Sequence, residues 1–240
     1  MKKFELVIPA YNEEEVIEDT VTKIYNFLTE SYPHDDWNLT IANNKSTDQT
    51  NQIVLDLTKK FPRLKLVYIP AQGKGHAVYE TWKRSEADIV AFTDADLSLD
   101  VSSISKLLNT ISDEHPVAIA SRRLKESRVE RDWVRAVTSG IYNRTTNFIL
   151  KTYLSDHQCG LKAIKRELFN KVEPLLTERE WFFDTELLYV LKQNNIKVKE
   201  VPIIWRESQR QSRVTSIKDN SIKGLKLIWR LKKNSGKLKK

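Results

Sequence analysis

The chain has 240 residues, 40% of them hydrophobic and 30% charged, with a formal net charge of +8. This length and balance favour one large globular domain, and the positive charge favours an anionic partner such as a phosphorylated substrate, an acidic membrane surface or nucleic acid. The single Cys159 excludes an intrachain disulfide framework, and no run reaches the roughly 18 apolar residues that cross a bilayer, so we expect a protein of a reducing compartment without a transmembrane segment.

Short apolar runs alternate with helical patterns through the first half of the chain. Strands are expected at residues 4–9, 39–42, 64–69, 89–92 and 117–120. Between them, apolar residues recur at helical spacing. Strands separated by helices form right-handed βαβ units, so the sequence predicts an α/β fold with a single, mostly parallel, Rossmann-like sheet flanked by helices. Because the first strand follows almost directly on Met1, no signal peptide is expected.

Two carboxylates follow the apolar run at 89–92. Asp94 and Asp96 stand at the carboxyl end of a strand that is expected to be buried, where open α/β sheets bind ligands. Paired carboxylate oxygens suit a hard divalent cation such as Mg²⁺ or Mn²⁺, which in turn holds phosphates. The alternative is a solvated, Asp-rich turn.

A glycine loop precedes the helix expected at about 77–85. Gly73, Lys74 and Gly75 lie in this loop, which can present backbone N–H groups and an ammonium group to an anion. The later glycines of a dinucleotide or Walker A motif are missing, so an ordinary turn is the alternative.

Five arginines follow the strand expected at 117–120, namely Arg122, Arg123, Arg128, Arg131 and Arg135. They form either a solvated face or a phosphate-binding cluster, because the guanidinium fork matches phosphate oxygens. Further on, a helix is expected over 134–151 and a turn over 155–162. Asp184, beside three aromatic residues, has a raised pKa or a fixed orientation, or caps the helix expected at 187–193.

The end of the chain is basic. Residues 217–231 predict a basic amphipathic helix that suits an anionic bilayer surface, or else a surface helix packed on its own domain. The tail from 232 to 240 is expected to be disordered. We therefore divide the chain into a main domain, 1–216, and a basic C-terminal segment, 217–240.

The order of the motifs is more specific than any one of them. VIPAYNEE at 7–14, the Asn-Asn-x-Ser-Thr-Asp loop at 43–48, GKGHA at 73–77, DADLS at 94–98 and ASR at 120–122 resemble family 2 inverting glycosyltransferases with a GT-A fold. DHQCGLK at 156–162 and EWFFDTELLY at 180–189, followed by Trp205 and SRV at 212–214, resemble the dolichyl-phosphate β-glucosyltransferase branch. The resemblance runs from about residue 4 to 214.

This resemblance implies transfer of a sugar from a UDP-sugar to a polyprenyl phosphate, with Mg²⁺ or Mn²⁺ as the cofactor. Glucose is the sugar that we expect. The implied UDP-sugar site comprises Pro9, Ala10, Tyr11, Glu13, Asn43, Gly73, Lys74, Asp94, Ala95, Asp96 and Arg213, with the metal on Asp94 and Asp96. The implied catalytic set is Asp96, Asp184, Arg122, Arg131 and Arg135, in which the arginines hold the acceptor phosphate. Asp156 and Gln158 are implied to line the sugar and acceptor side.

One departure from the family pattern concerns the contact with the nucleotide base of the donor. Relatives carry Asp-Asp-Gly-Ser where this chain has Asn-Asn-Lys-Ser at 43–46, so a hydrogen-bonding side chain is kept and a charge is lost. The runner-up activity is a family 2 transferase acting on a glycan or glycolipid hydroxyl, with Asp184 as base. A nucleic-acid-binding module is a third hypothesis. The predicted location is peripheral, on the cytoplasmic face of a membrane, without nucleic acid as a partner.

Overall fold

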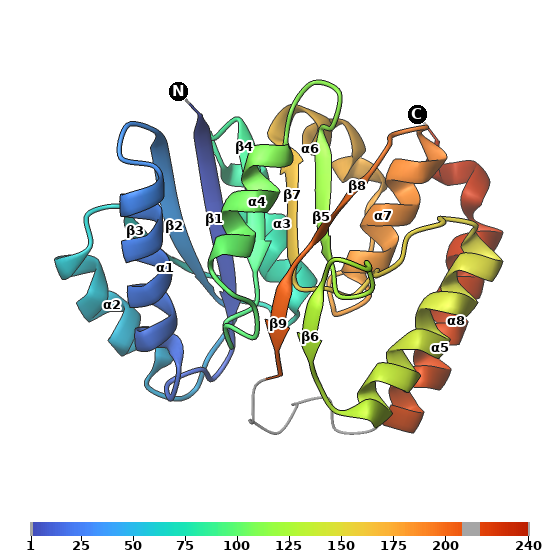
Figure 1. The fold of residues 1–240 in the computed structure, drawn as a ribbon, viewed down its shortest axis with the longest axis horizontal. Helices are drawn as coiled ribbons and strands as arrows, with labels where there is room; N and C mark the ends of the chain where they lie inside the picture. Colours follow the sequence, from blue (N-terminus) through green and yellow to red (C-terminus); the bar gives the residue numbers. More distant parts are fainter. Residues whose placement is uncertain (1, 208–216, 240) are drawn as a thin grey trace.

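The computed structural model describes the backbone of residues 2–207 and 217–239. Its centre is a seven-stranded sheet with the order β3-β2-β1-β4-β7-β5-β8 (Figure 1). The strands are β1 (Lys3–Ala10), β2 (Asp36–Asn43), β3 (Leu64–Tyr68), β4 (Ile89–Thr93), β5 (Val117–Ser121), β7 (Leu161–Lys165) and β8 (Lys199–Pro202). A two-stranded ribbon joins β6 (Arg128–Glu130) to β9 (Ile204–Arg206).

The sheet is mostly parallel, which confirms the predicted fold class. Strand β1 runs parallel to β2 and β4, and β5 runs parallel to β8. Strand β7 is the exception, because it runs antiparallel to both β4 and β5 and places Ala163 opposite Ala91 and Ala118. The sequence analysis expected a turn up to residue 162 and did not predict β7.

Helices cover both faces of the sheet (Figure 1). They are α1 (Ile17–Ser31), α2 (Thr50–Lys60), α3 (Lys74–Arg84), α4 (Ser102–Thr110), α5 (Trp133–Leu150), α6 (Arg166–Val172), α7 (Phe183–Gln193) and α8 (Ile217–Lys233), with the short η1 (Glu173–Leu175) and η2 (Ser235–Leu238). None of these described helices is long and apolar enough to span a membrane.

Two apolar clusters hold the layers together, one on each face. Alternation along β1 sends Leu6 and Ile8 toward α1, α2 and α4, and Val7 toward α3 and α7. Helix α1 meets the sheet with one buried stripe that includes Ile17, Val21, Ile24 and Leu28, as the spacing of its apolar residues predicts. The strand ends are thereby fixed by core packing on both faces.

The C-terminal part of the described chain is ordered and packed. In α8, Ile228 and Leu231 are buried in the second apolar cluster, and Leu238 of η2 joins them. The Asn194 side-chain amide donates to the Leu238 carbonyl at 2.8 Å. The prediction of a disordered tail is therefore wrong for residues 232–239, because apolar burial and this hydrogen bond hold the segment on the domain.

Candidate functional site

The predicted site residues gather at one edge of the sheet. Because β1, β2 and β4 are parallel, their last residues, Ala10, Asn43 and Thr93, lie at the same edge (Figure 1). The reversed strand β7 begins at that edge, with Leu161 opposite Thr93. The loop that leads into β7 therefore joins an edge formed by the carboxyl ends of parallel strands.

Asp94 and Asp96 follow β4 at this edge. The Asp94 N–H donates to the Gly160 carbonyl at 3.1 Å, which ties the turn after β4 to the start of β7. The exposed Asp96 carboxylate accepts hydrogen bonds from the Ser98 N–H and Oγ at 3.2 and 2.9 Å. Ala95 between them is buried. The two carboxylates are thus fixed by their neighbours.

This donor set fits a metal that a substrate helps to hold. Among the described residues, no group of three or more His, Cys, Asp or Glu side chains could enclose an ion. Mg²⁺ commonly takes one or two protein carboxylates and completes its shell with phosphate oxygens and water. Asp94 and Asp96 match that requirement, whereas a metal held by protein ligands alone does not fit the described residues.

Two lysines and two aspartates form a charge cluster behind these carboxylates. Lys74 Nζ lies 2.8 Å from Asp94 Oδ1 and 3.4 Å from Asp184 Oδ2, and Lys162 Nζ lies 2.7 Å from Asp184 Oδ1. Burial would lower the pKa of Lys74, but Asp184 and Asp94 outweigh it and raise that pKa. Burial would raise the pKa of Asp184, but Lys162 and Lys74 lower it.

Lys162 is a residue that sequence reasoning missed. Its side chain is 1% exposed near the start of β7, where it also donates to the Cys159 carbonyl at 2.7 Å. Its ammonium group lies 5.6 Å from the centre of the Phe92 ring. A lysine between apolar residues in a buried strand was the available signal, because such a charge needs a partner.

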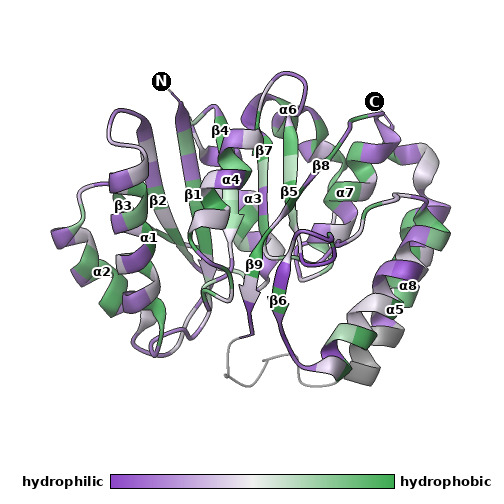
Figure 2. Cartoon of the chain, viewed as in Figure 1, coloured by the Kyte–Doolittle hydropathy of each residue, from purple (hydrophilic) through white to green (hydrophobic). Residues whose placement is uncertain are grey.

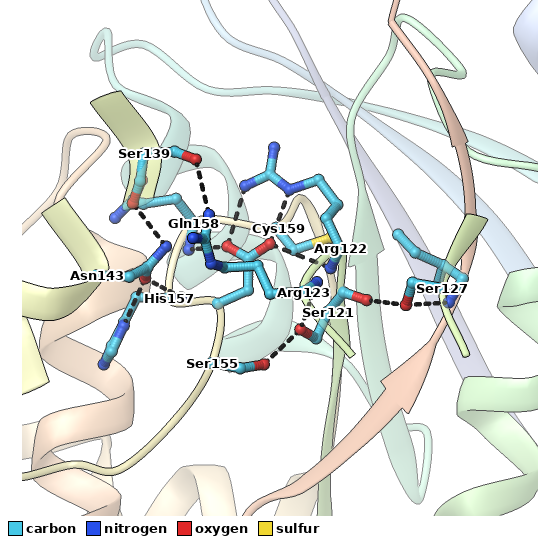
Figure 3. A network of polar contacts seen from close by, with 12 residues as sticks. Ser121, Arg122, Arg123, Ser127, Ser139, Asn143, Ser155, His157, Gln158 and Cys159 are labelled. Carbon is cyan, nitrogen blue, oxygen red and sulfur yellow. Dashed lines mark hydrogen bonds and ion pairs between the residues drawn. The ribbon is translucent and has the colours of Figure 1, made fainter. Parts of the chain in front are cut away.

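The first arginine of the cluster is neutralised inside the protein. Arg122 donates from Nε and Nη2 to the buried Asp156 carboxylate at 2.7 and 3.0 Å, and its guanidinium lies 5.0 Å from the Trp205 ring centre (Figure 3). Burial would lower the pKa of Arg122, but Asp156 raises it. The pair fixes the loop that holds Asp156 against the end of β5.

Arg131 carries an unsatisfied donor. Its Nη1 and Nη2 groups donate to Ser139 Oγ at 3.2 Å and to the Arg135 carbonyl at 2.8 Å, but its buried Nε has no partner among the described residues. Burial and the nearby Arg122 lower the pKa of Arg131. The guanidinium of Arg123 also reaches Ser139, at 3.4 Å. Positive charge therefore exceeds negative charge around Arg131.

The predicted arginine trio is only partly assembled. Arg122 and Arg131 lie close enough to repel each other, whereas the Arg135 guanidinium pairs with Glu207. Arg123, which received no role in the sequence analysis, shares Ser139 with Arg131. The direction in which each arginine points depends on contacts between distant segments.

A polar network connects the loop before β7 to α5 and α7. Gln158 Nε2 donates to Thr185 Oγ1 at 2.8 Å. Asn143 Oδ1 lies 2.9 Å from the His157 N–H and 2.8 Å from its Nδ1 (Figure 3). Burial lowers the pKa of His157 to about 4, so this imidazole is neutral near pH 7. Through Thr185, Gln158 contacts the residue that follows Asp184 on α7.

The residues predicted for the nucleotide lie at the ends of β1 and β2. Asn43 uses both ends of its amide inside the protein, donating to Asn51 Oδ1 at 2.7 Å and accepting from the Ser46 N–H at 3.0 Å. Its neighbour Asn44 has a buried side-chain oxygen without a partner among the described residues. Tyr11 accepts a hydrogen bond from Gln72 at 3.1 Å. After Lys162 and Arg123, Asn44 is therefore a third residue that the sequence analysis left without a role.

Pro9 and Glu13 flank the turn that follows β1. Pro9 is half-buried beside Ala10, and the Glu13 N–H donates to Thr50 Oγ1 at 2.7 Å. Arg213, which was predicted to close over the diphosphate, lies outside the described residues.

The glycine loop is shaped by a close backbone approach. Gly73 has φ +133°, and a Cβ atom there would stand 2.2 Å from the Arg179 carbonyl oxygen. That carbonyl accepts a hydrogen bond from the His76 N–H at 2.6 Å. Lys74 begins α3 directly after this contact and reaches Asp94, so the loop positions its ammonium group at the sheet edge.

Comparison with known proteins begins with the family. The model of the family described as glycosyl transferase family 2 matches residues 5–173. Glycosyltransferase AglD of Haloferax volcanii is 30% identical over 216 residues, which cover 89% of this chain and 34% of AglD. The dolichyl-phosphate beta-glucosyltransferases of Saccharomyces cerevisiae and Mus musculus are 29% and 28% identical, covering 84% and 86% of this chain and 66% and 68% of those proteins.

The chain therefore spans about a third of AglD and about two thirds of the yeast and mouse relatives. Among solved structures, glucosyl-3-phosphoglycerate synthase from Mycobacterium tuberculosis, in complex with Mn²⁺, UDP and phosphoglyceric acid, matches with a TM-score of 0.72 and 16% identity. The match covers 95% of this chain and 78% of that one, and it shows that the two share the GT-A fold. The family match, the motifs and the fold agree, and the chain belongs to glycosyl transferase family 2.

Proposed function

We propose that this glycosyltransferase moves a sugar, for which we propose glucose, from a UDP-sugar to a polyprenyl phosphate, with inversion at the anomeric carbon. The names of the yeast and mouse relatives support a dolichyl-type lipid phosphate and a glucosyl group. The Mycobacterium tuberculosis enzyme, solved with UDP and Mn²⁺ on the same fold, supports a UDP-sugar and a divalent metal.

The observation that supports a phosphate acceptor is the excess of positive charge around Arg131. Its buried Nε has no partner among the described residues. Burial, followed by the repulsion from Arg122, lowers the pKa of Arg131, although Glu207 and Asp156 act in the opposite direction. A phosphate would satisfy that donor and relieve the repulsion, since guanidinium and phosphate form charge-assisted hydrogen bonds. A neutral hydroxyl would do neither.

The proposed reaction forms one bond and breaks one. An oxygen of the acceptor phosphate attacks the anomeric carbon, and the bond from that carbon to the UDP oxygen breaks on the opposite face. A Mg²⁺ or Mn²⁺ ion on Asp94 and Asp96 would neutralise charge on the departing diphosphate. Lys74 lies beside Asp94 and adds a second positive charge there. The nucleophile needs no base, because a phosphate monoester is mostly dianionic near neutrality.

The state of Asp184 also supports a phosphate acceptor. This carboxylate is 2% exposed and lies between two ammonium groups that lower its pKa. A general base for a hydroxyl acceptor needs a pKa near the working pH and access to the proton it removes. Asp184 in this setting acts better as a fixed anion that holds Lys74 and Lys162. We place the enzyme, as a peripheral protein, on the cytoplasmic face of a membrane that carries the acceptor.

A donor–acceptor screen tests the proposal. Radiolabelled UDP-sugars are incubated with short polyprenyl phosphates or with glycan and glycolipid acceptors, and products are separated by solvent extraction. We expect label from UDP-glucose in the lipid phase with the phosphate acceptor, and loss of transfer when EDTA removes the metal. Transfer to hydroxyl acceptors alone would overturn the proposal, as would full activity in EDTA.

A further inference from the structure

Helix α5 exposes large apolar side chains along one side. Trp133, Val137, Ile141 and Phe148 are 73%, 52%, 61% and 84% exposed. Their spacing of four, four and seven residues places them within an arc of about 80° over a length of about 22 Å. Such a stripe normally faces a core, but here its side chains are exposed. Figure 2 shows hydrophobic residues among those of α5.

Helix α8 packs beside α5 and also exposes apolar side chains (Figure 1). Ile228 and Leu231 hold α8 on the domain, while Leu225 and Trp229 are 43% and 63% exposed. The six exposed side chains, which we call the α5–α8 apolar face, are Trp133, Val137, Ile141, Phe148, Leu225 and Trp229. Large exposed apolar areas of this kind mark contact surfaces.

The charges around this face suit an anionic surface. Helix α5 contains no Asp or Glu in its 18 residues, and Arg144 is exposed among the apolar positions. On α8, Lys226, Lys232 and Lys233 are exposed. Two further basic residues of α8, Lys223 and Arg230, are engaged by glutamates of the loop before α7. A second copy of the chain would bring these positive charges together, whereas anionic lipid headgroups would neutralise them.

We propose that the α5–α8 apolar face lies in the interfacial layer of an anionic lipid bilayer. This inference rests on the proposed function, which supplies the lipid acceptor, and it names the surface that meets the membrane. Aromatic side chains beside basic ones are the composition of interfacial helices. On its other side α5 presents Ser139 to Arg131, so the arginine cluster lies about one helix diameter, or roughly 10 Å, from the lipid.

Tryptophan fluorescence gives a direct test. Of the described tryptophans, Trp133 and Trp229 are exposed, Trp181 is half-buried, and Trp37, Trp82 and Trp205 are buried. The full chain is mixed with vesicles of phosphatidylcholine, alone or with phosphatidylglycerol, in which the lipid chains carry bromine as a quencher. We expect quenching that is stronger on the anionic vesicles, and loss of most of it in the Trp133→Phe/Trp229→Phe variant.

Sedimentation with the same vesicles tests the energetic contribution of the face. Trp133→Ser/Phe148→Ser should lower binding to anionic vesicles by about tenfold or more, because two large side chains no longer enter the interface. The matched control, Leu55→Ser/Tyr68→Ser, removes two exposed apolar side chains, 44% and 56% exposed, from α2 and β3, and should bind like the wild type.

Several outcomes would overturn the inference. Equal binding by both double variants, or salt-sensitive binding that neither variant changes, would mean that net charge alone attracts the protein. A dimer that dissociates in Trp133→Ser/Phe148→Ser, without vesicle binding by the wild type, would assign the face to a second copy of the chain. Transfer to a water-soluble, short-chain polyprenyl phosphate should be unchanged in this variant. If the wild type binds vesicles but transfers no sugar to the short-chain polyprenyl phosphate, the proposed function is wrong, whereas the assignment of the α5–α8 apolar face to the membrane is supported.

Discussion

At the scale of single residues, the protein neutralises most of its buried charges itself. Asp184 lies between Lys162 and Lys74, and Arg122 lies against Asp156. Arg131 differs, because its buried Nε has no partner among the described residues, and burial together with the nearby Arg122 lowers its pKa. An anionic ligand is therefore expected to gain more from Arg131 than from the other buried charges.

Replacing Arg131 by alanine should weaken use of the acceptor and spare the donor. Losing one charge-assisted contact costs about 1.5–3 kcal/mol, so kcat/KM for polyprenyl phosphate should fall roughly ten- to a hundred-fold. The dissociation constant of UDP, measured by calorimetry with Mn²⁺, should change little. The control is Arg128→Ala, which removes an exposed arginine from the same run. Similar kinetics for both variants would contradict the role given to Arg131.

His157 should make the fold less stable in mild acid. Burial lowers its pKa from 6.5 to about 4, so the unfolded chain binds a proton there that the folded protein does not. The contribution of His157 to the free energy of unfolding is fully present above pH 6.5. It is lost as the pH falls toward 4, by about 3 kcal/mol in total. Urea unfolding across this window measures the slope.

The variant His157→Gln should show a flatter pH dependence of unfolding than the wild type, even if it is less stable at neutral pH. The control, His34→Gln, changes an exposed histidine and should keep the wild-type slope. Parallel slopes for all three proteins would show that another group causes the loss in acid.

At the scale of elements, the apolar runs predicted strands β1 to β5, and the order of strands and helices predicted the mostly parallel sheet. Strand β7 was missed, because its sequence LKAIK has lysines at the second and the last position and lacks a local strand signature. The charge of Lys162 is compatible with burial only because Asp184 on α7 meets it. Neither segment alone contains a sequence signal that predicts such a pairing.

For the candidate site too, the sequence predicted what depends on local structure and did not predict contacts between distant segments. The positions of Asp94 and Asp96 followed from the end of a buried strand, which is a local property. The partners of the arginines did not follow, because the contact of Arg135 with Glu207 depends on how the β6–β9 ribbon folds. The membrane role of the basic segment was left open against packing on the domain, and α8 does pack through Ile228.

The junction of β4 and β7 predicts that Gly160→Ala will impair transfer. A Cβ atom at residue 160 would stand 1.6 Å from Asp94 Oδ2, so the carboxylate proposed to hold the metal must move. We expect transfer to fall by about a hundredfold or more, the range of losses when a charge-stabilising group is displaced. The control is Gly236→Ala, where a Cβ meets nothing within 4 Å. Steady-state kinetics and thermal unfolding of both variants check the result, and a fully active Gly160→Ala would rule out a fixed Asp94.

At the scale of the whole molecule, α8 is part of the folded domain on one side and a free surface on the other. Lys223 and Arg230 pair with Glu180 and Glu178 in the loop before α7. The same loop supplies the Arg179 carbonyl that meets the glycine loop. The packed outer helices and the charged edge of the sheet therefore belong to one connected structure.

Adjacent residues of α8 should differ sharply in their effect on stability. Ile228→Ala should lower the free energy of unfolding by about 2–5 kcal/mol, because it empties a fully buried site in the second apolar cluster. Trp229→Ala, at the exposed neighbour, should change it by less than about 0.5 kcal/mol. Urea denaturation followed by circular dichroism compares them. Equal effects of the two substitutions would mean that α8 does not dock as described.

The reversed strand β7 also constrains how the chain can fold during synthesis. It lies between β4 and β5 but is made after both, so the two halves of the sheet remain unjoined until residue 165 has left the ribosome. Until then the edges of β4 and β5 are open and offer unpaired N–H and C=O groups to other chains. Closing the gap joins strands separated by a long stretch of sequence, a slow step for any sheet. The same insertion that brings Gly160 to Asp94 therefore makes the nascent chain depend on protection from aggregation.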